Sequence, residues 1–333
     1  MLAVQMHAPG GPQVLEVVTL PDLPVPPGHV AVQAAAIGVG RPDVLIRTGK
    51  YKWMPPLPAV LGNELTGTVS ETGAGVDAGW VGRPVLVSSR ELPTRGGCYA
   101  TRVVVPAEAI IPLPDGTDLV EAACLPNYQL AWGLLHDATR GRLPRSIYLN
   151  GAGGGVGSAL VQLCVLLGVE VVAGAGSDEK RAFARTLGAA AVVDTSDEGS
   201  LVAQVLDATG GRGVEVAYDH LCGPGLARHL ELLAPFGLLV SYNALRGLPQ
   251  QDVFAALRGH AAHALGIVTY NMHAHDDARE RRRALLQQPM EWLAAGRLRP
   301  LVRQRLPLAE ARRAHEMLDA GSIVGKMVLL PES

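Results

Sequence analysis

The chain has 333 residues, of which 48% are hydrophobic and 18% are charged, and its formal net charge at pH 7 is −2. This length allows two domains with a core each, and the composition is that of a folded protein rather than a disordered one. A charge near zero gives no reason to expect nucleic acid or an anionic membrane as a partner. No apolar run reaches the roughly 18 residues of a transmembrane helix, so no membrane is expected.

Four cysteines stand singly along the chain, at Cys98, Cys124, Cys164 and Cys222. Because no two of them form a C-x-x-C pair, neither a zinc knuckle nor a disulfide framework is expected. The first residues contain no basic stretch ahead of an apolar core, which argues against a signal peptide. These features predict a cytoplasmic protein.

Residues 1 to about 110 are expected to form mainly β-structure. Short runs rich in Val and Thr alternate there with turns that contain Pro and Gly. The expected strands cover residues 14–19, 30–35, 67–71, 84–88 and 99–105. Strands of this length and spacing are typical of a compact, barrel-like domain. A helical turn is expected at residues 42–47, and a helix over residues 119–138 should lead to the next domain.

From residue 146 to about residue 268, strands and helices alternate. Strands are expected at residues 146–150, 169–173, 191–194, 214–219 and 238–242, with helices at 158–167, 178–187, 200–208 and 226–233. This alternation predicts a doubly wound parallel sheet. Ligands of such sheets bind at the carboxyl ends of the strands. We therefore expect Leu221, Tyr242 and Asn243, which follow two of the strands, to flank a bound ribose or nicotinamide.

The turn after the first of these strands holds five glycines between Gly151 and Gly157. A strand, a glycine turn, a helix and a second strand form the βαβ unit that binds dinucleotides. Backbone N–H groups at the start of the helix can approach a pyrophosphate closely, which a Cβ would prevent. We assign Gly154, Gly155 and Val156 to this role. The alternative is a glycine-rich turn that is purely structural.

The end of the second strand indicates which dinucleotide is bound. Enzymes that use NAD usually carry an acid there for the ribose 2′-OH, but residues 174–177 read Gly-Ala-Gly-Ser. The nearest acids come later, in the first turn of the next helix, where carboxylates are favoured in any case. Ser177, Lys180 and Arg181 are expected to hold a 2′-phosphate, so the predicted cofactor is NADPH. The alternative is that the two basic side chains are solvated helix charges.

After residue 276 the pattern becomes helical again. Pro289 should kink or split a helix over residues 277–295. A helix over residues 307–319 and a closing strand over residues 324–330 are expected to complete the chain.

A series of short motifs runs along the chain: Asp43 with Arg47-Thr48-Gly49-Lys50-Tyr51, Gly62-Asn63-Glu64, Gly97-Cys98-Tyr99-Ala100, Leu125-Pro126, the glycine turn, Gly176-Ser177-Asp178-Glu179-Lys180, Thr209-Gly210-Gly211-Arg212-Gly213-Val214 and Gly325-Lys326. In these motifs and their order the chain resembles the zinc-free quinone oxidoreductase branch of the medium-chain dehydrogenase/reductase superfamily. The resemblance implies an α/β fold with an N-terminal GroES-like β-barrel domain, residues 1–118 and 269–333, that binds the substrate. It also implies a doubly wound parallel-sheet Rossmann domain, residues 119–268, Lys326 near the cofactor, and a homodimer.

Zinc alcohol dehydrogenases of this superfamily place a Cys near the position of Gly40 and a His where Asn63 stands. Because these two residues cannot supply those ligands, no metal is expected. The cofactor then carries the chemistry, and the resemblance implies an NADPH-dependent oxidoreductase that transfers hydride to a quinone or an α,β-unsaturated carbonyl. The second acceptor also needs a proton donor. Tyr51 and Tyr128 are the candidate catalytic residues, the alternative being that both are packing aromatics.

Two further functions stay open. The protein could be an enoyl or alkenal reductase of a biosynthetic pathway. It could also bind NADPH with little turnover, because Gly40 and Leu130 lack the polar side chains that the family often has at these positions.

Overall fold

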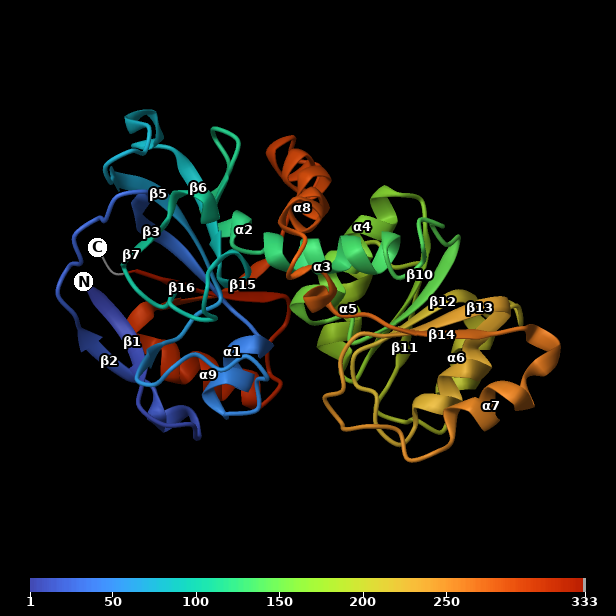
Figure 1. Cartoon of the computed structure of the whole chain (residues 1–333). Helices are drawn as coiled ribbons and strands as arrows, with labels where there is room; N and C mark the ends of the chain where they lie inside the picture. The colour runs from blue at the N-terminus through green and yellow to red at the C-terminus, as the bar shows by residue number, and fades with distance from the viewer. Residues whose placement is uncertain (332–333) are drawn as a thin grey trace. The chain divides into compact units, whose positions relative to one another are not determined.

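The computed structural model of the protein describes residues 1–331, and the chain divides into two compact units (Figure 1). The first unit contains residues 1–126 and the chain from residue 286 onward, and the second contains residues 127–285. The domain boundary expected after residue 268 falls inside β14 (Gly266–Thr269), a strand of the second unit. In this division, the whole of β14 belongs to the second unit.

The first unit is built mainly from β-strands. They are β1 (Leu2–Met6), β2 (Glu16–Thr19), β3 (His29–Val39), β4 (Ala59–Val60), β5 (Glu64–Thr72), β6 (Pro84–Ser88), β7 (Arg102–Pro106), β8 (Ile110–Pro112), β15 (Val302–Pro307) and β16 (Lys326–Leu330). One sheet has the order β2-β1-β4, and a larger one has the order β15-β16-β3-β5-β6-β8, with β7 also paired to β3. The predicted mainly β domain is confirmed, and β16, from the C-terminal segment, pairs with β3.

The core of the first unit is organised around β3. Val30 and Val32 are fully buried, whereas Gln33, the residue after Val32, is exposed. A register shift between Ala34 and Ala36 then moves the positions that join the main core cluster of this unit from even numbers, as in Val32 and Ala34, to odd numbers, as in Ile37 and Val39. This irregularity lets one long strand contribute to the core along its whole length.

The second unit contains a six-stranded sheet in which every pair is parallel. Its strands are β9 (Ser146–Asn150), β10 (Glu170–Ala175), β11 (Ala191–Asp194), β12 (Val214–Asp219), β13 (Leu233–Ser241) and β14. The order is β11-β10-β9-β12-β13-β14. The direction of winding reverses between β9 and β12, where ligands bind in folds of this kind. The predicted doubly wound Rossmann sheet is confirmed.

Helices cover both faces of this parallel sheet, with α4 and α5 on one side and α6 and α7 on the other (Figure 1). The helices of the chain are α1 (Arg41–Arg47), α2 (Leu119–Ala122), α3 (Leu125–His136), α4 (Gly155–Leu166), α5 (Asp178–Thr186), α6 (Leu201–Ala208), α7 (Val253–Gly259), α8 (Arg279–Ala294) and α9 (Ala311–Asp319). Shorter 3-10 helices are Pro12–Val14, Ala78–Trp80, Ser89–Glu91, Ala107–Ala109, Leu226–Leu232, Ala261–His263, Met272–His275 and Leu308–Glu310. Within residues 1–331, every helix is too short or too polar to span a bilayer.

Two local predictions differ from the structure, and several further elements were not predicted. The helix expected over residues 226–233 is a 3-10 helix, and Leu233 already belongs to β13. The helix α8 is neither interrupted nor divided at Pro289. A proline removes one backbone hydrogen bond, and the buried Leu286 and Leu293 on either side hold this helix in place. The strands β1, β4, β8, β14 and β15 and the helix α7 were not predicted.

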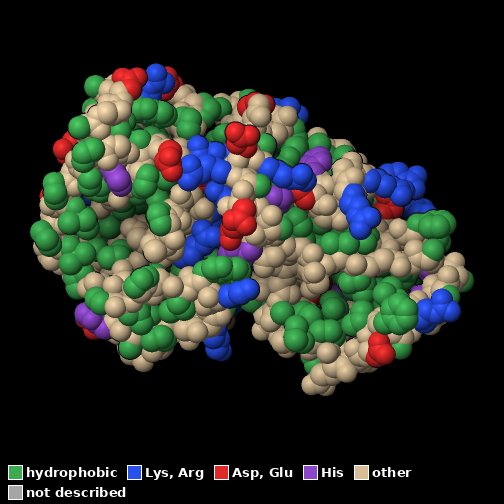
Figure 2. Space-filling view, in the orientation of Figure 1, with side chains coloured by type: hydrophobic (Ala, Val, Ile, Leu, Met, Phe, Trp, Pro, Cys, Tyr) green, Lys and Arg blue, Asp and Glu red, His purple; other side chains and the backbone are tan. Residues whose placement is uncertain are grey.

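On the face of the molecule shown in Figure 2, basic and acidic side chains are interspersed among hydrophobic and polar ones. This distribution agrees with a formal net charge of −2.

Candidate cofactor-binding site

The glycine turn links β9 to α4, and its glycines serve different purposes. A Cβ on Gly157 would lie 2.2 Å from the carbonyl oxygen of Gly151, so this glycine lets α4 pack against the turn. Gly151 itself has a φ of 78°, which favours glycine. A Cβ on Gly154, in contrast, would meet only the Gly151 oxygen, at an ordinary 3.6 Å. Nothing in the described part of the chain requires a glycine at position 154.

Gly154 is the N-cap residue of α4 and offers the first turn of the helix no side-chain hydrogen bond. The N–H groups at the start of a helix attract anions, and the helix dipole adds to this preference. A residue without a side chain at this place leaves room for an anion against the helix terminus. The turn therefore fits a pyrophosphate, with Gly154, Gly155 and Val156 presenting their backbones.

The segment after β10 lies close to the same turn. Ser177 caps α5, and its hydroxyl oxygen accepts the backbone N–H of Lys180 at 3.4 Å. The aliphatic stem of Lys180 crosses the glycine turn, since a Cβ on Gly153 would lie 2.7 Å from the Cγ of this lysine. The structure thus brings Ser177 and Lys180, two of the residues predicted to hold a 2′-phosphate, next to the predicted pyrophosphate site.

The third predicted residue, Arg181, is oriented differently. Its Nη2 lies 2.6 Å from the carboxylate of Asp178, and its Nη1 lies 2.8 Å from that of Asp194. The same Nη1 donates to the carbonyl oxygen of Ala175 at 3.0 Å. The guanidinium of Arg181 is therefore held by the protein itself.

At the switch point, Asp219 ties the ends of β9 and β12 together. Its carboxylate accepts the side-chain amide of Asn150 at 3.1 Å and the backbone N–H of Cys222 at 2.5 Å, and it lies 3.3 Å from the ring of His229. Burial alone would raise the pKa of Asp219, but His229 and these hydrogen bonds lower it below its ordinary value. The carboxylate is thus kept ionised, and Cys222 is held with a φ of 55°.

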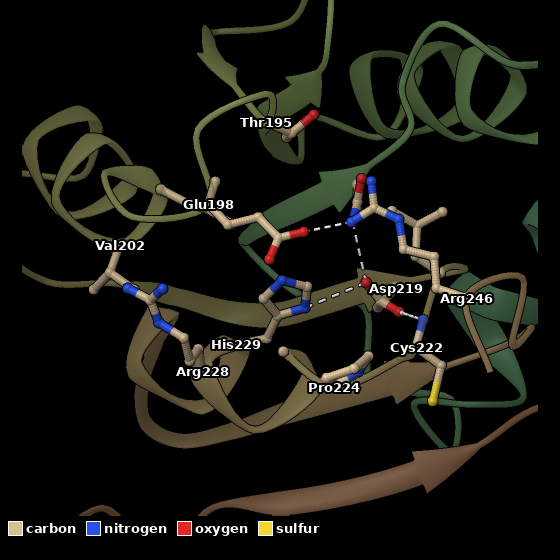
Figure 3. A pocket seen from close by; sticks show the side chains of 13 residues that line it. Thr195, Glu198, Val202, Asp219, Cys222, Pro224, Arg228, His229 and Arg246 are labelled. Atoms are coloured by element: carbon tan, nitrogen blue, oxygen red, sulfur yellow. Dashed lines mark hydrogen bonds and ion pairs between the residues drawn. The ribbon is translucent and has the colours of Figure 1, made fainter. Parts of the chain in front are cut away.

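A cavity of about 300 Å³ opens beside Asp219 (Figure 3). Leu201, Val202 and Leu221 supply apolar walls, and Thr195 lies at its edge. Glu198 and Arg246 point toward one another across it and form an ion pair. The volume lies at the lower end of the range for small-molecule sites.

Of the residues predicted to flank the ribose or nicotinamide, Leu221 lines this cavity, whereas Tyr242 and Asn243 do not. Tyr242 lies at the end of β13, and its ring centroid is 6.0 Å from that of His220. His220 in turn contacts the carbonyl oxygen of Asn150 at 3.1 Å, next to the glycine turn. Arg246 is a residue of the cavity that was not predicted from the sequence, because loops distant in sequence bring it there.

Tyr51 and Lys326 belong to the first unit and Tyr128 to the second. Tyr51 is partly buried, and its ring centroid lies 5.8 Å from that of Trp53. Tyr128 is 2% exposed within α3. Lys326 is buried, and its ammonium group forms an ion pair with the carboxylate of Glu64.

Lys326 and Glu64 are part of a buried polar cluster with Asp43 and Asn63. The carboxylate of Asp43 accepts the backbone N–H of Gly40 at 2.8 Å and the amide of Asn63 at 2.7 Å. Burial, followed by the nearby charge of Glu64, raises the pKa of Asp43 to about 7, although these hydrogen bonds and Lys326 oppose the shift. The cluster therefore contains a carboxyl group that titrates near neutral pH.

We expect the free energy of unfolding to fall as the pH rises from 3.8 toward 7, since unfolded Asp43 loses its proton near 3.8 and folded Asp43 keeps it until about 7. In this window the unfolded state binds fewer protons, so each added pH unit costs up to ~1.4 kcal/mol of stability. Above pH 7 this contribution is constant. Urea unfolding at a series of pH values measures the slope.

In the variant Asp43→Asn, the free energy of unfolding should no longer show the fall with pH that Asp43 causes between pH 3.8 and 7, whatever the overall stability of the variant. Asp115→Asn, which changes an exposed carboxylate of the same unit, serves as the control and should keep the slope. Equal slopes in the wild type and Asp43→Asn would contradict the assignment.

Comparisons with known proteins match the two units separately and the chain as a whole. Residues 26–115 match the family model of the alcohol dehydrogenase GroES-like domain, and residues 155–286 match that of zinc-binding dehydrogenase. The quinone oxidoreductase of Pseudomonas aeruginosa is 32% identical over 329 residues, which cover 98% of this chain and 99% of the relative.

Two solved structures are similar over essentially the full length. The quinone oxidoreductase of Escherichia coli, complexed with NADPH, has a TM-score of 0.86 at 27% identity and covers 99% of this chain and 100% of its own. A protein described as an NAD-dependent alcohol dehydrogenase has a TM-score of 0.87 at 30% identity, with 100% of both chains covered. The predicted combination of a GroES-like domain and a Rossmann domain is confirmed.

Proposed function

The chain belongs to the quinone oxidoreductase branch of the medium-chain dehydrogenase/reductase superfamily, and on this basis we propose that it is an NADPH-dependent oxidoreductase that works without zinc. Its acceptor is a quinone or an α,β-unsaturated carbonyl. The observation that carries the proposal is the opening at Gly154, where a residue without a side chain caps α4 and the chain itself has no need of a glycine. The bound cofactor supplies the hydride.

In this proposal the second unit binds the cofactor. The backbones of Gly154, Gly155 and Val156 hold the pyrophosphate at the start of α4. Ser177 and Lys180 hold the 2′-phosphate, and the absence of an acid in residues 174–177 supports NADPH over NADH.

The remaining predicted residues have supporting roles. Leu221 supplies an apolar part of the wall of the cavity beside Asp219 and suits a base or ribose, whereas Tyr242 and Asn243 would approach the cofactor at the end of β13. Lys326 stays a candidate on the resemblance alone.

The side chains at the expected zinc position favour a reaction without metal. Gly40 has no side chain that could offer a ligand atom. Both polar atoms of the Asn63 amide already form hydrogen bonds: its nitrogen donates to Asp43 at 2.7 Å, and its oxygen accepts the hydroxyl of Ser89 at 2.7 Å. Within residues 1–331, no group of three or more His, Cys, Asp or Glu side chains is placed to hold a metal ion. A catalytic zinc normally needs three protein ligands.

The two acceptor classes place different demands on the protein. A quinone accepts hydride at an electron-poor oxygen or carbon, and its product can take a proton from water. An α,β-unsaturated carbonyl needs a proton at the α-carbon and a donor to the developing enolate oxygen. Tyr51 and Tyr128 are our candidates for that donor.

The experiment follows NADPH oxidation by the purified protein with a 1,4-quinone and, separately, with a 2-alkenal whose product is analysed. We expect oxidation with at least one acceptor. Saturated aldehyde as product would show alkene reduction and favour the alternative of an enoyl or alkenal reductase, with Tyr51→Phe as the next variant. Saturable NADPH binding without oxidation by either acceptor would contradict the enzyme and favour a cofactor-binding protein with little turnover.

We also propose a homodimer in which the edge strand β14 pairs with its copy. This strand ends the sheet and has one neighbour, β13, in the described chain. Phe254, on α7 before this strand in the chain, is 72% exposed, which is unusual for a large aromatic residue. Light scattering should give about twice the chain mass of 34.9 kDa, and a monomeric mass would contradict the proposal.

A further inference from the structure

The charge next to the expected 2′-phosphate site is set by an ion-pair network around Arg181. The side chain of Arg181 is only 15% exposed, and its guanidinium lies between the carboxylates of Asp178, at 2.6 Å, and Asp194, at 2.8 Å. Its third contact, to the carbonyl oxygen of Ala175 at 3.0 Å, fixes it to the carboxyl end of β10. Arg181 therefore links the ends of two neighbouring strands.

Asp194 stands beside the segment that is expected to receive the 2′-phosphate. It is the last residue of β11, and its register partner on β10 is Ala175. The next residue, Thr195, contacts that segment directly: a Cβ on Gly174 would lie 2.8 Å from its Cγ2, and a Cβ on Gly176 would lie 3.6 Å from its Oγ1. A carboxylate thus lies at the edge of a site proposed for a phosphate.

The contacts of Asp194 converge on one oxygen. Its Oδ1 accepts the backbone N–H of Ser196 at 2.8 Å, the hydroxyl of Ser196 at 2.7 Å and the Nη1 of Arg181 at 2.8 Å. The hydrogen bonds from Ser196, followed by the charge of Arg181, lower the pKa of Asp194. This side chain is therefore ionised at neutral pH, and Arg181 is the cation that balances it.

We propose that Arg181 is a positioning residue for cofactor choice, which neutralises Asp194 and thereby allows the 2′-phosphate to bind without contacting it. This inference rests on the proposed function, since it concerns the same cofactor site. Without Arg181, the carboxylate would repel the 2′-phosphate of NADPH. The same carboxylate would tolerate the 2′-OH of NADH, which carboxylates accept in NAD-dependent enzymes.

A double-mutant cycle separates this role from direct binding. The dissociation constants of NADPH and NADH are measured by the change in nicotinamide fluorescence for the wild type, Arg181→Ala, Asp194→Asn and the double variant. Arg181→Ala should bind NADPH about tenfold more weakly, with NADH nearly unchanged. The double variant should bind NADPH within about threefold of the wild type, because the charge of Asp194 is gone and the remaining carboxylate, Asp178, is fully exposed and screened by solvent.

The result that would overturn the inference is a double variant as weak as Arg181→Ala, since this would mean that Arg181 contacts the phosphate. Unchanged NADPH binding by Arg181→Ala would overturn it as well. Circular dichroism and thermal unfolding establish that each variant is folded, and Arg181→Gln replaces the alanine variant if that protein is unstable.

Lys180 provides the matched comparison on the same helix. Because its ammonium group is expected to bind the phosphate directly, Lys180→Ala should weaken NADPH binding and Asp194→Asn should not restore it. Failure of the wild type to bind NADPH would overturn the proposed function and this inference with it. NADPH binding by the wild type without rescue in the double variant would overturn the inference alone.

Discussion

Replacing Gly154 with alanine is expected to leave only a small fraction of NADPH binding at cofactor concentrations that just saturate the wild type, while the protein stays folded. The new methyl group would make an ordinary contact, 3.6 Å from the Gly151 carbonyl oxygen, and the φ of −88° suits alanine. The same methyl group would stand where a pyrophosphate must approach the N–H groups of α4. We expect a loss of affinity on the order of 100-fold, because hydrogen bonds to the charged pyrophosphate, worth about 1.5–3 kcal/mol each, would be lost.

Fluorescence titration measures the affinity, and thermal unfolding establishes that the fold is retained. Gly259→Ala is the matched control, because a Cβ at this last residue of α7 would meet no described atom within 4 Å. It should bind NADPH like the wild type. Undiminished binding by a folded Gly154→Ala protein would show that the glycine turn does not hold the pyrophosphate.

Replacing Lys326 with methionine is expected to lower the free energy of unfolding by about 3–5 kcal/mol, the usual cost of breaking a buried ion pair. The ammonium group of Lys326 pairs with Glu64, and the two side chains are 6% and 12% exposed. Without the ammonium group of Lys326, the carboxyl groups of Glu64 and Asp43 would face each other inside the first unit. Methionine keeps a similar length, so lost packing contributes little. Urea unfolding at constant pH measures the effect.

The exposed Lys50 supplies the control for this change. Lys50→Met should alter the free energy of unfolding by no more than about 0.5 kcal/mol. If the two methionine variants were equally stable, the buried pair would not stabilise the first unit as we describe.

The parts of the fold that local patterns specify were predictable from the sequence. The glycine turn, the alternation of strands and helices and the resulting parallel sheet all depend on neighbouring residues. The strand β15 was not predicted from the sequence. It pairs with β16, and the helix α9 separates the two strands in the chain, so no residue near 302–307 indicates the pairing. The 3-10 helix at Leu226–Leu232 has an apolar pattern close to that of an α-helix, which the sequence could not distinguish.

The electrostatics of the site were less accessible to sequence reasoning. Lys180 and Arg181 are adjacent cations, and only the structure shows that their side chains have different partners. Lys180 lies against the glycine turn, whereas Arg181 forms an ion pair with Asp194 on the neighbouring strand. Likewise, Lys326 and Glu64 are 262 residues apart and meet only in the folded chain. Contacts of this range depend on the completed tertiary structure, which no local motif contains.

The measurement that tests the central claim most directly is the rate of NADPH oxidation by a 1,4-quinone, with chelator-treated wild type and Gly154→Ala protein compared side by side. Our account predicts quinone-dependent oxidation by the wild type, an unchanged rate after removal of metal ions, and a strongly reduced rate for Gly154→Ala at NADPH concentrations that just saturate the wild type. A wild-type activity that disappears with the chelator, or a Gly154→Ala protein as active as the wild type under these conditions, would contradict it.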